Sequence, residues 1–390
     1  MKCSIIATGT ELIIGQTINR NAPEISKKIL KFGFEVHHHL TVSDQANEIY
    51  WAIEQSSKCS DLIIITGGLG PTSDDLTRNV VADWCGHDLK WDEDSWQHVC
   101  ERMQSRGFQV KEIQKQQCYF PYKSIIIKNL RGTANAFYVE AKNKILVVLP
   151  GPPNEIESVW NNGISQFLQQ LSIEKNLDPV KMKVWDTLGL GESDVAMKVE
   201  TVLADFYRTH HLESKIESKF EIGYRVHLPY VEVKLIYCQS VETEMKLLVA
   251  LMENELREIT KFRDFENVKN SILKQVKKSK FKKIIIYDQV SQGRFLQHLT
   301  QDPFLLEVTL PISYFQNQTK DQFIQNNDEA LILELSSCDQ QTWSFRINDR
   351  DCKIVYPFTA STMLERNRQF ALEMCLIEFN QYLTLNVPSI

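Results

Sequence analysis

The stretch ITGGLGPTSDDLT, residues 65–77, runs from an apolar strand through three glycines and a proline to two adjacent aspartates that are predicted to open a helix. Glycines at the end of a buried strand remove side chains from the edge of an open α/β sheet where ligands bind. Backbone N–H groups in such a loop can hold an anion, and the positive end of the following helix adds to the attraction. The stretch has neither the GxxxxGK[ST] spacing of a P-loop nor the third glycine of GxGxxG, so it predicts a phosphate loop of another kind.

The surrounding sequence alternates between strands and helices. Buried strands are predicted at 3–9, 34–42 and 61–66, with helices over 21–32, which Gly33 ends, and over 44–57 beneath a Ser43 N-cap. Two further strands flank a turn at Lys142 and Asn143, and a helix starts at Asn154. This order predicts an α/β fold with a doubly wound, mostly parallel sheet.

The length of 390 residues suits two or three domains, each with its own core. The first domain is assigned to residues 1–172. A strand, a glycine turn, a helix, a second strand and a second helix follow over 173–263 as a small α+β module. An α/β domain that opens with the apolar strand KKIIIYDQ occupies 264–390.

Composition argues against several classes of protein. The 43% hydrophobic and 24% charged content is that of a globular chain, and no apolar run approaches the roughly 18 residues that span a bilayer, so no membrane partner is expected. The net charge of −6 argues against nucleic-acid binding, and the basic run 274–283 is interpreted as a solvated linker or helix face. Nine cysteines without a CxxC pair indicate reduced thiols rather than a structural zinc site. Because the start of the chain also lacks a signal peptide, the protein is expected to be cytoplasmic.

The aspartates of the opening stretch allow two interpretations. Thr72 and Asp75 have the spacing of a capping box at the start of a helix that Gly86 would end, so the carboxylates would only satisfy the helix. Alternatively, a divalent cation lies between the carboxylates and bound phosphates, since Mg²⁺ prefers carboxylate and phosphate oxygens. Asp44, at the end of the second strand, would then share the metal with Asp75, although it can also be a first-turn carboxylate beside Ser43.

The segment TGTELIIGQTINRNA, residues 8–22, begins where the first strand ends. It adds polar groups at a neighbouring strand end, among them Glu11, Gln16, Asn19 and Asn21. Consecutive strand ends of one parallel sheet bring their loops together. The segment is therefore either a second wall of the ligand site or an irregular surface loop.

Four segments of the first domain together resemble the CinA family: GTELIIGQTINRNA, TGGLGPTSDDLTR, RGTANAF and LPGPPNE occur in that order. The resemblance implies a first domain similar to the molybdopterin-binding domain of molybdenum-cofactor enzymes. The segment LGLGES, residues 188–193, resembles the KH-like module of the family. The third domain resembles the family's nicotinamide-nucleotide amidase domain only weakly.

For the first domain, the resemblance implies a divalent-metal-dependent pyrophosphatase that acts on ADP-ribose or a related dinucleotide, and it makes a homodimer the expected assembly. Hydrolysis would need a metal to polarise a phosphoryl group and a carboxylate to orient or deprotonate the attacking water. Asp75 and Asp44 are the expected metal or water ligands, Glu11 is the third catalytic candidate, and the identity of the base is open. Substrate contacts are expected from Gly67, Gly68, Gly70, Thr72, Asp74, Asn19, Lys115, Gln117, Gly132, Thr133 and Gly151.

The first domain departs from the family pattern in two places. Where many relatives read RKQA, residues 115–118 read KQQC, so one basic residue of two is missing. GTANAF replaces GTAPGF, which puts Asn135 and Ala136 where proline and glycine would shape a turn. These changes leave the predicted metal end intact and affect the contacts expected at the far end of the substrate.

The third domain departs further. Relatives with amidase activity carry AESCTGG after the first strand, with the serine as nucleophile, whereas residues 287–293 read YDQVSQG and place Gln289 at the serine position. A glutamine amide cannot replace an alkoxide in acyl transfer, and Ser291, two residues on, would point elsewhere. The family's TYSNxxK segment corresponds to YFQNQTK, residues 314–320, and no glycine follows Gly293. This pattern predicts a pseudo-amidase domain retained for structure or assembly.

Two other classes of function remain open. A nucleotide- or pterin-binding module without turnover is compatible with the fold and is favoured by the missing basic residue. An assembly or regulatory protein is suggested by the altered third domain. His37 and His39 are predicted to share one strand face, a geometry that can hold a metal, but histidines at a sheet edge are commonly metal-free.

Overall fold

The structure is a computed structural model that describes residues 1–210, 216, 218–264, 267–279, 281–311, 330–339, 342–348, 350–355 and 364–386. The chain divides into two compact units, residues 1–181 with 238–240 and residues 182–237 with 241–390. The predicted domain boundaries at 172 and 263 fall within helix α7 (Ser165–Glu174) and at the last residue of strand β12 (Thr260–Arg263). Among the helices that the structure describes, none is long and apolar enough to cross a membrane.

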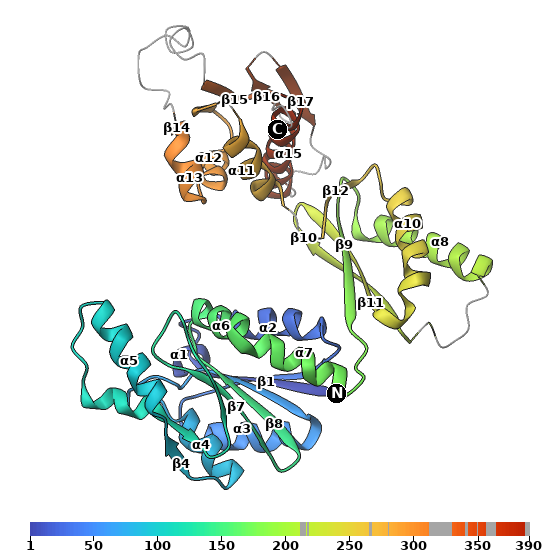
Figure 1. Cartoon of the computed structure of the whole chain (residues 1–390). Helices are drawn as coiled ribbons and strands as arrows, with labels where there is room; N and C mark the ends of the chain where they lie inside the picture. Colours follow the sequence, from blue (N-terminus) through green and yellow to red (C-terminus); the bar gives the residue numbers. More distant parts are fainter. Residues whose placement is uncertain are drawn as a thin grey trace. The chain divides into compact units, whose positions relative to one another are not determined.

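The first unit is built on a sheet of order β2-β1-β3-β8-β7-β6 (Figure 1). Strands β2, β1, β3 and β8 are parallel, whereas β7 and β6 run antiparallel to their neighbours. The predicted doubly wound, mostly parallel sheet is confirmed. The strands are β1 (Lys2–Thr8), β2 (Glu35–Val42), β3 (Leu62–Thr66), β6 (Ile125–Ile127), β7 (Ala136–Ala141) and β8 (Lys144–Leu149).

Helices cover both faces of this sheet, because successive side chains along each strand enter opposite cores. Cys3 and Ile5 pack with α2 (Asn21–Leu30), α6 (Pro153–Val159) and α7 on one face. Ile6 and Ile63 pack with α3 (Ala46–Cys59) and α4 (Thr77–Cys85) on the other (Figure 1). The remaining elements of the unit are α1 (Thr10–Ile13), β4 (Leu89–Trp91), α5 (Glu93–Ser105), η1 (Glu112–Cys118), β5 (Tyr119–Pro121) and η2 (Trp160–Ile164).

Two local predictions in this unit have different outcomes. The turn between β7 and β8 is confirmed: Lys142 and Asn143 have φ of 51° and 58°, the left-handed pair that a two-residue hairpin needs. The helix predicted from Asp44 begins at Ala46, after an extended Gln45, and no side chain caps it, so the predicted Ser43 cap is wrong. The carboxylate of Asp44 is bound elsewhere.

The middle of the chain forms a sheet of order β10-β11-β9-β12. Apolar side chains of α8 and α10 pack against it, including Val195 and Leu248. The two predicted strands and two predicted helices are present, but the second helix ends at Glu255 rather than near residue 260, and β10 and β12 are additions. The elements are β9 (Val180–Leu188), α8 (Glu192–His210), β10 (Phe220–His227), β11 (Tyr230–Cys238), η3 (Gln239–Val241), α10 (Glu242–Glu255) and β12.

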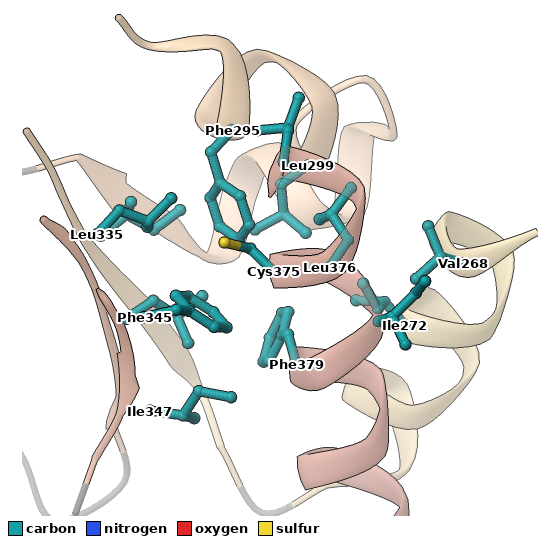
Figure 2. Packing of buried hydrophobic residues seen from close by; sticks show 14 of the residues in the cluster. Val268, Ile272, Phe295, Leu299, Leu335, Phe345, Ile347, Cys375, Leu376 and Phe379 are labelled. Atoms are coloured by element: carbon teal, nitrogen blue, oxygen red, sulfur yellow. The ribbon is translucent and has the colours of Figure 1, made fainter. Parts of the chain in front are cut away.

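The C-terminal part forms a sheet of order β14-β13-β15-β16-β17, parallel between β14, β13 and β15 and antiparallel beyond. Figure 2 shows Cys375, Leu376 and Phe379 of the long helix α15 between the strand residues Phe345 and Ile347 and helix α11. Lysines of the basic run lie on the exposed face of α11, as predicted. The elements are α11 (Val268–Lys278), β13 (Lys283–Asp288), α12 (Arg294–Leu299), α13 (Pro303–Val308), β14 (Thr309–Pro311), β15 (Ala330–Asp339), β16 (Thr342–Ile347), β17 (Arg350–Val355) and α15 (Leu364–Asn386).

Candidate functional site

The glycine loop follows β3 directly, and its three glycines leave no room for side chains. Gly67 has a φ of 98°, and a Cβ there would lie 2.5 Å from the carbonyl oxygen of Thr8. Gly68 has a φ of 66°, and its Cβ would overlap the hydroxyl of Thr77. A Cβ on Gly70 would overlap the carboxylate of Asp75. The glycines therefore let the end of β3 approach the end of β1 and let the loop close over its own helix.

Arg78 binds the backbone of this loop, a role that was not predicted from the sequence. Its side chain is buried, and its guanidinium donates to the carbonyl oxygens of Leu69 at 2.6 Å and Gly70 at 2.8 Å. Burial lowers the pKa of Arg78 to about 10, against the opposing charge of Asp75, so the side chain remains a cation at neutral pH. An arginine in the first turn after a glycine loop is the sequence signal that could have revealed it.

Of the capping box considered for Thr72 and Asp75, only the bond from the Thr72 N–H back to Asp75 is present, and it does not cap a helix. Helix α4 begins at Thr77, and its N-cap position, Leu76, makes no side-chain hydrogen bond. Thr72 instead donates its backbone N–H at 2.9 Å and its hydroxyl at 2.6 Å to Asp75 Oδ2, within a turn that precedes the helix. Gly86 does end the helix in a left-handed conformation, as predicted. The exposed Asp74 lies in the same turn, so both aspartates belong to the loop and not to the helix.

Asp44 and Glu11 lie at the ends of neighbouring strands. The backbone N–H of Thr10 donates to Asp44 Oδ2 at 2.8 Å, which ties the end of β2 to the short helix α1 after β1. Glu11, the next residue, is exposed, and its carboxylate lies so close to Gly9 that a Cβ there would be 2.6 Å from Oε1. The expectation that strand ends bring these loops together is confirmed for Asp44 and the Thr10–Glu11 turn.

A cleft of about 700 Å³ opens where β1, β3 and β8 end. It gathers three of the predicted site residues, Glu11, Asn19 and Gly151, while Asp44 and Asp75 are not part of its described lining. Asn21 donates to the carbonyl oxygen of Gly151 at 2.8 Å, so the segment after β1 is fixed to the segment after β8. The full lining is Thr8, Glu11, Leu12, Gln16, Thr17, Ile18, Asn19, Arg20, Asn21, Thr66, Gly151, Pro152 and Pro153.

The loop that carries Gly132 and Thr133 is organised by a buried asparagine whose role was not predicted from the sequence. Asn129 Oδ1 accepts the N–H groups of Arg131 and Gly132, and its amide donates to Glu155 at 2.7 Å. Asn135, the residue that departs from the family pattern, accepts from the Asn129 backbone N–H at 2.8 Å. The substituted asparagine therefore shapes the turn through its side chain.

The polar residues predicted for the far end of the substrate have separate surroundings. Lys115 pairs with Glu112 at 2.8 Å, which raises the lysine pKa above its ordinary value. Gln117 is buried, with 2% of its surface exposed, so its side chain faces the interior. Gln116, which had no predicted role, donates to the carbonyl oxygen of Thr72 at 3.1 Å and so braces the glycine loop.

In the C-terminal part, Gln289 is exposed just after β13, and its N–H continues the ladder to Leu335. Ser291 is buried, its hydroxyl contacts the Asp288 carboxylate, and it accepts from the Phe295 N–H at 3.0 Å at the start of α12. The Ser291 hydroxyl therefore forms hydrogen bonds within the turn between β13 and α12. The motif at 314–320, with Asn317 and Lys320, lies outside the described residues.

Among the described residues, two groups of three side chains have potential metal-ligand atoms that all lie within 4.8 Å of one another. One group is His37, His38 and Cys59, and the other is Asp186, His227 and Glu232. Neither group includes Asp44 or Asp75, so the metal predicted between these two aspartates stays a prediction.

Comparison with known proteins places this geometry in a family. Residues 4–170 match the family model of the probable molybdopterin binding domain. A competence-damage inducible protein of Clostridium botulinum (strain ATCC 19397 / Type A) is 39% identical over 203 residues, which are 52% of this chain and 49% of that protein. The crystal structure of the protein CinA, of unknown function, from Thermoplasma acidophilum is 30% identical over 43% of this chain and 99% of that chain, with a TM-score of 0.40. The chain belongs to the CinA family.

A second competence-damage inducible protein, from Caldicellulosiruptor saccharolyticus, is 36% identical over 203 residues, 52% of this chain and 48% of that protein. The chain thus spans about half the length of the curated CinA relatives it matches. The glycine loop, the cleft at the strand ends and the Asn129 loop all lie within the molybdopterin-binding-like part of this CinA protein.

Proposed function

We propose that the first unit of this CinA protein hydrolyses the pyrophosphate bond of ADP-ribose or a related dinucleotide, with a divalent cation such as Mg²⁺. The observation that carries the proposal is the cleft of about 700 Å³ where β1, β3 and β8 end. Small-molecule sites have volumes of roughly 300 to 1,000 Å³, so a dinucleotide-sized ligand fits. Amide side chains on its wall, among them Asn19 and Gln16, suit the hydroxyl groups of a ribose.

The glycine loop supports binding of the pyrophosphate. Gly67 is buried, whereas Gly68 and Gly70 are half-buried just after the end of β3, where parallel sheets bind ligands. The buried guanidinium of Arg78 lies directly against the loop carbonyls and adds positive potential close to the expected phosphate position. Phosphates would therefore meet backbone donors and a fixed cation in one place.

The donor set of Asp44 and Asp75 fits a hard cation. Each carboxylate uses Oδ2 for the loop hydrogen bonds described above, and its Oδ1 takes none of those bonds. Carboxylate oxygens held in this way, completed by phosphate oxygens and water, are what Mg²⁺ prefers. Such an ion would neutralise the pyrophosphate and polarise one phosphoryl group.

The protein's own residues have distinct tasks in this proposal. Thr72 fixes the Asp75 carboxylate, and the Thr10 N–H fixes that of Asp44, so neither needs to be ordered when substrate binds. Glu11, exposed at the cleft, is available to orient the attacking water and accept its proton.

A second candidate function has its own observation. Because Asp44 and Asp75 already accept hydrogen bonds inside their loops, both carboxylates can be purely structural, and the unit would then bind a nucleotide or pterin without turnover. In either case we propose that the C-terminal part has no amidase activity, since Gln289 stands at the nucleophile position and Ser291 is engaged in its turn. It would then serve structure or homodimer assembly.

The deciding experiment incubates the purified full chain with ADP-ribose and Mg²⁺ and follows AMP by chromatography. Asp75→Asn and Glu11→Gln are the test variants. Asp88→Asn is the matched control, because the Asp88 side chain is 90% exposed. AMP that requires Mg²⁺, that Asp88→Asn leaves unchanged and that Asp75→Asn reduces at least about 100-fold supports the enzyme.

Absence of AMP combined with protection of the chain by ADP-ribose against thermal unfolding would support the binding module instead. A parallel incubation with nicotinamide mononucleotide is expected to release no ammonia. Ammonia release would contradict the loss of the amidase nucleophile.

A further inference from the structure

The edge of the first sheet opposite the glycine loop carries a group of soft and borderline metal ligands. Because β1, β2 and β3 are parallel, their amino-terminal ends lie together at one end of the sheet, and the cleft lies at the opposite end, where the strands terminate. His37 and His38 lie near the start of β2, and Cys59 is the last residue of α3, just before β3. The group is therefore separate from the proposed nucleotide site.

An irregularity in β2 brings the two histidines together. Cys3 of β1 pairs with Val36, and the next residue, Ser4, pairs with His38, so His37 is an extra residue without a partner on β1. A bulge of this kind interrupts the alternation of side chains. Val36 and Leu40 confirm the switch, since they pack in the cores on opposite faces although they are four residues apart.

The contacts of the three histidines follow from this bulge. The rings of His37 and His38 lie 4.4 Å apart, and His38 Nδ1 lies 3.4 Å from Cys59 Sγ. His39 is bound differently, with Nε2 at 2.8 Å from the hydroxyl of Ser26 on α2. The prediction that His37 and His39 share a face is therefore wrong, because regular alternation does not hold at the bulge.

We propose that His37, His38 and Cys59 form a binding site for a thiophilic transition-metal cation such as Zn²⁺. Ligand atoms of the three residues all lie within 4.8 Å of one another. Two imidazoles with one thiolate suit zinc or copper and do not suit Mg²⁺ or Ca²⁺, which require oxygen ligands. Three protein ligands leave one position of a tetrahedral ion for water.

The surroundings of the group allow the ligands to close on an ion. Bond lengths of about 2.0 to 2.3 Å place tetrahedral ligand atoms roughly 3.5 Å apart, so movements of about 1 Å are needed. The two histidines are exposed and free to rotate that far, while Cys59 is half-buried and its thiol bonds the carbonyl oxygens of Gln55 and Ser56. When the metal binds, the Cys59 thiol loses its proton. One proton per ion is therefore released to solvent.

The test uses Co²⁺ as a spectroscopic probe and Zn²⁺ as its competitor on the full chain. Thiolate ligation gives Co²⁺ a near-ultraviolet charge-transfer band, which Zn²⁺ should remove by displacement. We expect one Co²⁺ per chain with this band in the wild type and no such band in Cys59→Ser. Affinity should fall at least about tenfold in His37→Ala and in His38→Ala.

His39→Ala is the matched control, because it removes a neighbouring imidazole that faces away from Cys59. Its Co²⁺ affinity and spectrum should equal those of the wild type. A charge-transfer band that survives in Cys59→Ser, or equal affinity of the His38→Ala and His39→Ala variants, would overturn the proposal. Since AMP formation depends on the opposite edge of the sheet, the same variants should leave that assay unchanged, which keeps the two proposals independent.

Discussion

Replacement of Gly67 by alanine tests the close approach of β3 to β1 that shapes the site. The left-handed φ of 98° costs an alanine about 1 to 2 kcal/mol. The new Cβ would also lie 2.5 Å from the Thr8 carbonyl oxygen, a backbone atom that cannot rotate away, which adds about 1 to 3 kcal/mol of overpacking. Gly86→Ala is the control, since Gly86 has a φ of 69° and nothing within 4 Å of its Cβ.

Hydrogen exchange read by mass spectrometry measures both variants on peptides from β1, β3 and β8, where opening free energies of the sheet are reported directly. We expect Gly67→Ala to lower the free energy of opening by about 2 kcal/mol more than Gly86→Ala, which is roughly 30-fold faster exchange. Equal effects of the two substitutions would refute the argument, because they would show that only the backbone conformation, and not the contact with Thr8, requires glycine.

Two further predictions concern the groups that hold the loops. Arg78→Met leaves the carbonyl oxygens of Leu69 and Gly70 without their charged donor. We expect this variant to lower the free energy of unfolding of the first unit, measured with urea, by about 3 to 5 kcal/mol. A decrease of less than about 1 kcal/mol would contradict the role of Arg78. Burial lowers the pKa of His98 below its ordinary value of 6.5, so the unfolded chain binds the proton more readily, and stability should be lost as pH falls below about 6.5. His98→Gln keeps a donor for the Gly132 carbonyl oxygen, and it should reduce the fall in melting temperature between about pH 7.5 and pH 5.5. If the melting temperature of this variant falls with pH as steeply as that of the wild type, His98 is excluded as the titrating group.

The sheet of the first unit could be predicted from the sequence because the signals are local. Buried strands such as the one before Gly67 read as short apolar runs, and Lys142 and Asn143 read as a turn between two of them. The chain order of strands and helices then leaves few topologies. Gly86 as a helix end is a further local signal that the structure confirms.

The site was less predictable because its details depend on contacts that residue types and spacing do not specify. Thr72 and Asp75 have capping-box spacing, but the same spacing closes a turn when the helix starts later. Here Arg78, in the first turn of α4, binds the carbonyl oxygens of Leu69 and Gly70 in the preceding loop. In the sequence, Asn129 cannot be distinguished from any other loop asparagine, because its partner Glu155 lies 26 residues away on α6. His37 becomes a neighbour of His38 only through pairing with β1, which a strand's own sequence does not reveal.

Isotope incorporation into the products is the sharpest test of hydrolysis at the pyrophosphate bridge. Hydrolysis of ADP-ribose in ¹⁸O-labelled water places the label on one phosphate product, because water supplies the oxygen that breaks the P–O–P bridge. We expect AMP and ribose 5-phosphate in equal amounts, with the label in one of them, only when Mg²⁺ and the wild-type Asp75 are both present. Unlabelled products, or products formed equally by Asp75→Asn, would contradict it.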